Sequence, residues 1–177
     1  GRKAQVIDRP GDLAVRRVQL VVARLDLGRN LGQGGLGHNR GVVEAWRTQG
    51  TIVIGDVGWD DSGTWDPADL APLDLVDLFT PNEDEARHYT RTASAQSAAA
   101  ALLGRVPRVV VTQGRDGVTA AEAGGVFSLP AYPAHTIDPT GAGDVFSAAL
   151  AWAVLRGGTL RQAASAAAVA GAMSTEG

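Results

Sequence analysis

The sequence predicts an α/β fold, in which a mostly parallel β-sheet carries helices on both faces. Short runs rich in β-branched residues alternate along the chain with longer stretches of helical pattern, and this alternation is typical of a parallel sheet. The clearest strand is residues 51–56 (TIVIGD), whose almost continuous apolar run fits a strand that is buried on both faces. The chain contains no internal repeat and no long low-complexity tract that would favour another architecture.

The first half of the chain is expected to alternate between strands and helices. Glycine and asparagine are frequent in residues 28–41, which favours a loop there. Gly50 marks the end of the helix that precedes the TIVIGD strand. We therefore expect strands at residues 18–27, 51–56 and 76–80, helices at residues 42–49 and 81–89, and loops at residues 28–41 and 58–67.

The second half adds three helices, one more strand and a hairpin. Ser94 is placed to cap an alanine-rich helix, and Thr159 with Gln162 forms the sequence pattern of a capping box. Gly124 and Gly125 separate two short apolar runs, as in a β-hairpin. The expected strands are residues 109–112, 118–121 and 126–129, the turn is residues 113–117, and the helices are residues 95–103, 141–156 and 160–174.

The composition fits one globular domain and excludes several classes of protein. The chain has 177 residues, 45% of them hydrophobic, and a formal net charge of −3. No segment approaches the about 18–20 unbroken apolar residues of a membrane span, and no secretory leader is visible, so we expect a cytoplasmic protein without a membrane partner. The chain contains no cysteine and three widely spaced histidines, which excludes disulfides and disfavours a histidine metal cluster. Its basic residues are scattered without interleaved aromatic residues, so no nucleic-acid partner is expected.

The run 138–144 (DPTGAGD) lies where an apolar helix is expected to begin. The first N–H groups of a helix have no internal partner, and together with the helix dipole they favour an anion at that end. Gly141 and Gly143 allow close approach to this backbone because they have no side chain. A carboxylate beside such a site, Asp144, is placed to accept a proton, which predicts phosphoryl transfer with Asp144 as the base. The alternative is a plain turn with a helix N-cap.

Two further motifs follow predicted strands, where ligands bind in open α/β sheets. Asn82 and Glu85 are three residues apart, so they share a helix face and offer oxygen atoms to Mg²⁺ or its waters. The alternative for this pair is simple N-capping. Gly114 and Gly117 follow Thr112 and permit a positive φ and a close ligand approach, although an ordinary turn has the same pattern.

The run 138–144, continued by Val-Phe-Ser-Ala-Ala-Leu, resembles the C-terminal signature of the ribokinase-like (PfkB) family of carbohydrate kinases. The resemblance implies that Gly141, Ala142 and Gly143 form an anion hole. It also implies that Asp144 deprotonates the sugar hydroxyl that attacks the γ-phosphate of ATP. No G-x-x-x-x-G-K-[ST] sequence is present, so this is not a Walker-type nucleotide site.

The same resemblance assigns roles to the other motifs. It implies that Asn82 and Glu85 help to position Mg²⁺ and phosphate, largely through water. A V-T-x-G-x-x-G segment borders the nucleotide in the family, which makes Thr112, Gly114 and Gly117 candidates for ATP binding.

The resemblance extends to two more positions. It implies that Asp138 and Thr140 help to hold a monovalent cation such as K⁺, the alternative being that Asp138 only stabilises the turn. Ser165 stands near the place where the family often has an adenine-flanking Asn, a departure that weakens a specific adenine contact.

The resemblance covers residues 42–177, about the C-terminal half of a family member, and leaves residues 1–41 as an atypical N-terminal segment. The expected fold is therefore ribokinase-like but truncated on its N-terminal side. The expected function is an ATP-dependent kinase for a sugar or nucleoside, with Mg²⁺ and with K⁺ as a further candidate cofactor. The alternatives are a nucleotide-binding fragment with impaired catalysis and a structural α/β remnant. The sequence leaves a homodimer open.

Overall fold

The computed structural model describes residues 20–24 and 40–176, and side chains from residue 40 onward. The predicted N-terminal segment 1–41 and the loop at 28–41 thus lie almost entirely outside the described residues. Within the described part, one six-stranded sheet has the order β1-β2-β3-β4-β5-β6. Its strands are β1 (Leu20–Arg24), β2 (Ile52–Asp56), β3 (Leu78–Phe79), β4 (Val109–Thr112), β5 (Val118–Glu122) and β6 (Gly125–Leu129).

The first four strands are parallel and the last two form an antiparallel hairpin, which confirms the predicted mostly parallel sheet. Val22 pairs with Ile54 and Phe79 pairs with Val109 in the parallel part. In the antiparallel part, Val118 lies between Thr112 and Leu129. The carboxyl end of β4, the start of β5 and the end of β6 therefore meet at one edge of the sheet.

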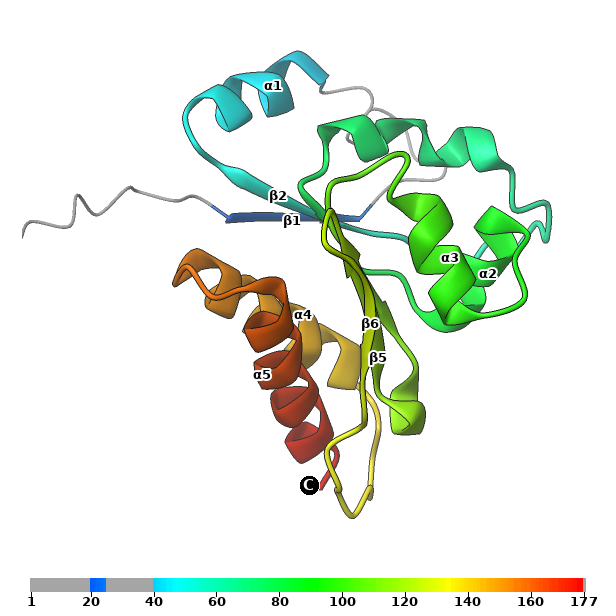
Figure 1. The fold of residues 1–177 in the computed structure, drawn as a ribbon, viewed down its shortest axis with the longest axis vertical. Coiled ribbons are helices and arrows are strands. Elements are labelled where there is room, and N and C mark those ends of the chain that lie inside the picture. The colour runs from blue at the N-terminus through cyan, green and yellow to red at the C-terminus, as the bar shows by residue number, and fades with distance from the viewer. Residues whose placement is uncertain (1–19, 25–39, 177) are drawn as a thin grey trace, which may run out of the picture.

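Helices cover both faces of the sheet (Figure 1). One face carries α1 (Arg40–Thr48), the 3₁₀ segment η1 (Pro67–Leu75), α2 (Glu83–Thr90) and α3 (Ala95–Leu102), and the other carries α4 (Ala142–Leu155) and α5 (Leu160–Met173). Two short 3₁₀ turns, η2 (Gly114–Asp116) and η3 (Ser174–Glu176), complete the described elements. No helix in the described residues has both the length and the apolar character needed to cross a membrane.

The sheet separates two hydrophobic cores because successive strand residues point to opposite faces. Val53 of β2 and Val111 of β4 belong to the core beneath α1, α2 and α3, whereas their neighbours Ile54 and Val110 belong to the core beneath α4 and α5. All four side chains are fully buried. This alternation explains why the strands read as continuous apolar runs.

The predicted helix caps are present. Ser94 accepts a hydrogen bond from the amide of Ser97 at the start of α3. Thr159 and Gln162 form the predicted capping box at the start of α5. Each cap satisfies N–H groups that have no partner inside the helix.

Three predicted boundaries were wrong, and one element was not predicted. Helix α2 begins at Glu83, two residues later than expected, after its N-cap Asn82. The strand expected at 76–80 is shorter than predicted and comprises only β3 (Leu78–Phe79). Asp77 interrupts the regular ladder, because its amide donates to the Val53 carbonyl and its carboxylate accepts from the Val53 amide, both at 2.8 Å. Helix α1 begins at Arg40, two residues earlier than expected. The unpredicted segment η1 begins at Pro67 after an Asp66 N-cap.

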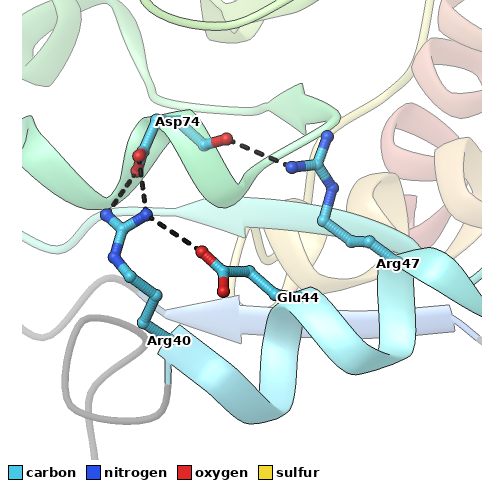
Figure 2. Close-up of polar contacts among 4 residues, drawn as sticks. All are labelled: Arg40, Glu44, Arg47 and Asp74. Carbon is cyan, nitrogen blue, oxygen red and sulfur yellow. Dashed lines mark hydrogen bonds and ion pairs between the residues drawn. The ribbon is translucent and has the colours of Figure 1, made fainter.

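Polar side chains tie α1 to η1 at the amino edge of the sheet (Figure 2). Arg40 makes two hydrogen bonds to the Asp74 carboxylate, at 2.8 and 2.9 Å. Arg47 donates to the Asp74 carbonyl at 3.2 Å and to the Asp77 carboxylate at 2.9 Å. Arg108 adds a bond from its Nε to the Asp77 carbonyl at 3.2 Å. This network lies at the edge opposite the motifs singled out in the sequence.

Candidate functional site

A cavity of about 740 Å³ lies at the carboxyl edge of β4. Its walls come from the turn after β4, the loop after β6, the first turn of α4 and the last two turns of α5. The residues that line it are Thr112, Gly114, Arg115, Gly117, Val118, Ala131, Tyr132, Pro133, Ala134, Thr136, Pro139, Ala142, Gly143, Phe146, Ala168, Gly171, Ala172 and Thr175. The structure thus brings two of the sequence motifs, residues 112–117 and 138–144, to one cavity.

The turn before α4 presents backbone N–H groups toward open space. Gly141 is the N-cap of α4 and has φ 79°, a conformation that glycine adopts without strain. Among the described residues, no acceptor is found for the amides of Gly141, Gly143 and Asp144, whereas the Ala142 amide donates to the Pro139 carbonyl at 3.2 Å. A Cβ atom added at Gly141 or Gly143 would meet no atom of the described residues within 4 Å. An anion can therefore reach the unused donors, where the helix dipole also favours it.

Asp144 is the third residue of α4 and is exposed. In the described part of the chain, no side chain or backbone group donates a hydrogen bond to its carboxylate. Gly143, the preceding residue, lines the cavity. Asp144 is not among the residues that line it. Its carboxylate is thus accessible to a second molecule that approaches the turn from solvent.

Asp138 and Thr140 act on each other. The Asp138 carboxylate accepts a hydrogen bond from the Thr140 amide at 2.8 Å. Bonds from the Thr140 side chain and, next, from its amide hold the pKa of Asp138 below its ordinary value. Both residues are exposed and neither lines the cavity. The structure therefore contains the hydrogen bond by which Asp138 stabilises the turn. The role of this pair in holding a cation stays a prediction.

Asn82 and Glu85 form a reciprocal capping box at the start of α2. The Asn82 side chain accepts from the Glu85 amide at 2.9 Å, and the Glu85 carboxylate accepts from the Asn82 amide at 3.0 Å. The described residues contain no group of three or more His, Cys, Asp or Glu side chains that could hold a metal ion. The role of this pair in Mg²⁺ binding stays a prediction.

The two strand-end motifs are adjacent in space. Asn82 forms a parallel bridge with Thr112, and the Thr112 amide donates to the Pro81 carbonyl at 3.0 Å. The capping box of α2 is therefore a direct neighbour of a residue that lines the cavity.

The turn after β4 depends on its glycines. Gly117 has φ 94°, and a Cβ atom there would stand 2.1 Å from the Leu129 carbonyl oxygen. Gly114 has φ 54° and open space around it. Side chains brace the turn as well: Gln113 donates to Glu83 at 3.2 Å and accepts from the Thr119 hydroxyl at 2.7 Å. Thr112, Gly114 and Gly117 all line the cavity, and their role in ATP binding stays a prediction.

Ser165 is not brought to the cavity. It is exposed, and the part of α5 that lines the cavity begins at Ala168, about 4.5 Å further along the helix axis. Sequence reasoning missed Ala168, Gly171, Ala172 and Thr175. Their spacing of three and four residues is the signal of a single helix face, here made of small residues. The irregular loop with Tyr132 carried no such signal.

Comparison with known proteins identifies relatives of one class. A family model described as pfkB family carbohydrate kinase matches residues 43–177. The bifunctional protein HldE of Caulobacter vibrioides is 34% identical over 143 aligned residues, which cover 76% of this chain and 28% of that protein.

Solved structures agree with this match. A ribokinase of Arabidopsis thaliana, complexed with ribose and ATP, is 27% identical with a TM-score of 0.72, over 92% of this chain and 51% of that one. A putative ribokinase II of E. coli, in complex with ATP and Mg²⁺, is 25% identical with a TM-score of 0.67, over 79% and 47%. The chain therefore spans about half the length of these two solved kinases and 28% of the curated relative.

Proposed function

The chain belongs to the pfkB family of carbohydrate kinases, and we propose that it forms the nucleotide-binding half of an enzyme that transfers the γ-phosphate of MgATP to a hydroxyl group of a sugar or nucleoside. The observation that carries this proposal is the turn before α4, where the amides of Gly141, Gly143 and Asp144 have no acceptor among the described residues and where Gly143 lines a cavity. The ribose, ATP and Mg²⁺ complexes of the two solved relatives support it.

In this proposal the chain's own groups position the reactants and stabilise charge. The free amides of Gly141 and Gly143 bind the oxygens of the phosphoryl group that is transferred. The Asp144 carboxylate accepts the proton of the acceptor hydroxyl as that oxygen attacks phosphorus and the bond to the ADP oxygen breaks. Ala142 contributes mainly backbone shape, because its amide is already bonded to Pro139.

The cavity next to the turn receives the nucleoside part of ATP. Thr112, Gly114 and Gly117 line it, together with Ala168, Gly171 and Ala172 of α5 and Thr175 of η3. Its volume of about 740 Å³ is in the range of nucleotide and cofactor pockets. Ser165 is not part of this binding surface, because it is not among the residues that line the cavity.

Two cation sites belong to the proposal. The oxygens of Asn82 and Glu85 suit a water-mediated Mg²⁺, which when bound neutralises charge on the phosphates. Asp138 and Thr140 would serve K⁺ beside the turn. A cytoplasmic location and a homodimer remain predictions.

The second candidate is a nucleotide-binding chain without turnover. The exposure of Asp144 favours it. Phosphoryl transfer depends on positioning both reactants, and the described residues offer a built cavity on one side of the turn only.

One experiment separates the two candidates. The purified chain is incubated with MgATP and K⁺ against a panel of sugars and nucleosides, and ADP release is compared with that of the Asp144→Asn variant. ADP release that depends on one acceptor supports the kinase and names its substrate. MgATP binding in calorimetry without release above the variant supports the second candidate, and absence of MgATP binding contradicts both.

A further inference from the structure

The 3₁₀ turn η3 (Ser174–Glu176) holds the segment that leads into the anion-binding turn. The carbonyl oxygen of Thr175 accepts two backbone hydrogen bonds, from Ile137 at 2.7 Å and from Asp138 at 3.0 Å. The Glu176 carboxylate accepts a bond from the His135 amide at 2.9 Å. Three amides of one loop are thus fastened by two consecutive residues that follow α5.

Thr175 is itself firmly seated. Its side chain is 7% exposed, and its hydroxyl lies 2.7 Å from the Ala172 carbonyl and 3.2 Å from the Thr136 hydroxyl. The direction of its carbonyl is therefore fixed by the end of α5 and by a second contact to the same loop. The turn η3 transmits the position of α5 to the loop.

From the loop, a short chain of bonds reaches the free amides. Asp138 is tied to Thr175 through its amide and accepts from the Thr140 amide through its carboxylate, at 2.8 Å. Pro139 stands between them with a ring-fixed φ, and its carbonyl accepts from Ala142 at 3.2 Å. These bonds and the proline ring leave few freely rotating backbone dihedral angles between Asp138 and Gly141. A displacement of Asp138 is therefore expected to move the turn at Gly141.

We infer that η3 is a clasp in which Thr175 and Glu176 act as positioning residues for the anion-binding turn of Gly141 and Gly143. This inference rests on the proposed function, because it concerns how the same phosphate site keeps its geometry. Glu176 is the cleaner residue to test, since it is exposed and does not line the cavity, whereas Thr175 does.

The test compares Glu176→Ala with Glu176→Gln, which keeps an acceptor oxygen, and with Glu122→Ala, which removes a negative charge at the far end of β5. Binding of MgATP and of inorganic tripolyphosphate is measured by calorimetry. We expect Glu176→Ala to weaken both ligands about tenfold, the scale of one lost charge-assisted hydrogen bond, and the other two variants to stay within about twofold. Loss of MgATP affinity with unchanged tripolyphosphate affinity would overturn the inference, because η3 would then shape only the cavity wall.

A second readout needs no ligand and separates this inference from the proposed function. In NMR-detected hydrogen exchange, Glu176→Ala should accelerate exchange of the Thr140 and Ala142 amides as well as of the Ile137 and Asp138 amides. Glu176→Gln should return these exchange rates to the wild-type values. Faster exchange at Ile137 and Asp138 alone would show that η3 does not position the turn at Gly141. If the wild-type chain binds neither ligand, the proposed function fails, and the exchange of Thr140 and Ala142 still decides whether η3 positions the turn.

Discussion

Gly171 of α5 packs against Ala142 of α4 so closely that a Cβ atom at Gly171 would stand 3.2 Å from the Ala142 carbonyl oxygen. The same Cβ would be 3.3 Å from the Cβ of Phe146. The end of α5 therefore sits directly on the first turn of α4. Since Gly171, Ala142 and Phe146 all line the cavity, its wall and the anion-binding turn form one packed unit.

Replacing the proposed base should separate binding from turnover. Asp144→Asn keeps the size of the side chain but removes its ability to accept the hydroxyl proton. Because Asp144 is exposed and has no donor among the described residues, we expect little change in stability or in MgATP affinity. We expect kcat to fall by about 10²–10⁴, the usual contribution of general base catalysis. Steady-state ADP release and calorimetry measure the two effects, and full turnover in the variant would show that another group is the base.

A methyl group at Gly143 should strengthen the fold and block the site. In the described part of the chain, a Cβ there meets no atom within 4 Å, and in the proposed function it would stand beside the bound phosphate. Alanine also favours a helix over glycine by about 0.5–1 kcal/mol. We therefore expect Gly143→Ala to raise the free energy of unfolding by up to about 1 kcal/mol while MgATP affinity falls at least about tenfold, or about 1.4 kcal/mol.

Gly41→Ala is the matched control for this change. Gly41 also lies in the first turn of a helix, α1, and no atom of the described residues is within 4 Å of an added Cβ. It should gain similar stability and leave MgATP affinity unchanged. Equal MgATP affinity in Gly143→Ala and Gly41→Ala would remove the Gly143 amide from the phosphate site.

The hydroxyl group of Tyr89 is a buried polar group without a partner among the described residues. Tyr89 is only 3% exposed, and burial raises the pKa of its phenol, so the group is neutral at all ordinary pH values. An unsatisfied buried hydroxyl costs about 1–3 kcal/mol. We expect Tyr89→Phe to raise the free energy of unfolding by about 1 kcal/mol in urea denaturation, and Tyr132→Phe, at a 47% exposed residue, to change it by less than about 0.5 kcal/mol. A loss of stability in Tyr89→Phe would mean that the hydroxyl has a partner in solution.

The contact between Arg40 and Asp74 should contribute to stability only above the acid range. Hydrogen bonding to Arg40 holds the pKa of Asp74 below its ordinary value of 3.8. A lowered carboxyl pKa contributes stability that is present above the unfolded-state pKa and is lost as the pH falls through the folded-state pKa. Asp74→Asn should therefore cost at most about 1 kcal/mol at pH 7, because both side chains are about half exposed. The cost should vanish as the pH falls well below 3.8. Denaturation at pH 7 and at low pH checks this, and a cost that does not depend on pH would contradict it.

Local signals in the sequence predicted much of the fold. The capping residues Ser94 and Thr159 and the glycines of the β5–β6 hairpin were identified because their chemistry is decided within three or four residues. The short strand β3 was overestimated because the interruption comes from Asp77, whose bonds to Val53 are 24 residues distant in sequence. Segment η1 was missed since Pro67 and Pro72 remove the period of an α-helix.

The candidate site could be predicted only in part, for the same reason. The motifs around Gly114 and Gly141 are contiguous, and they converge on the cavity. The loop with Tyr132 has no local pattern, and its position depends on long-range bonds to Thr175 and Glu176. Ser165 was chosen by its place in a motif, whereas the direction of α5 determines that only its final turns reach the cavity.

Asp77 has a consequence for how this protein can evolve. The Asp77 carboxylate bonds to Arg47 of α1 and to the Val53 amide of β2, and the Asp77 carbonyl accepts from Arg108, which precedes β4. These contacts lie at the edge of the sheet that faces away from the cavity. The framework is thus secured by residues that do not line the cavity. Loops at the opposite edge are free to accumulate substitutions that change specificity, and selection on stability falls on a different set of positions from selection on chemistry.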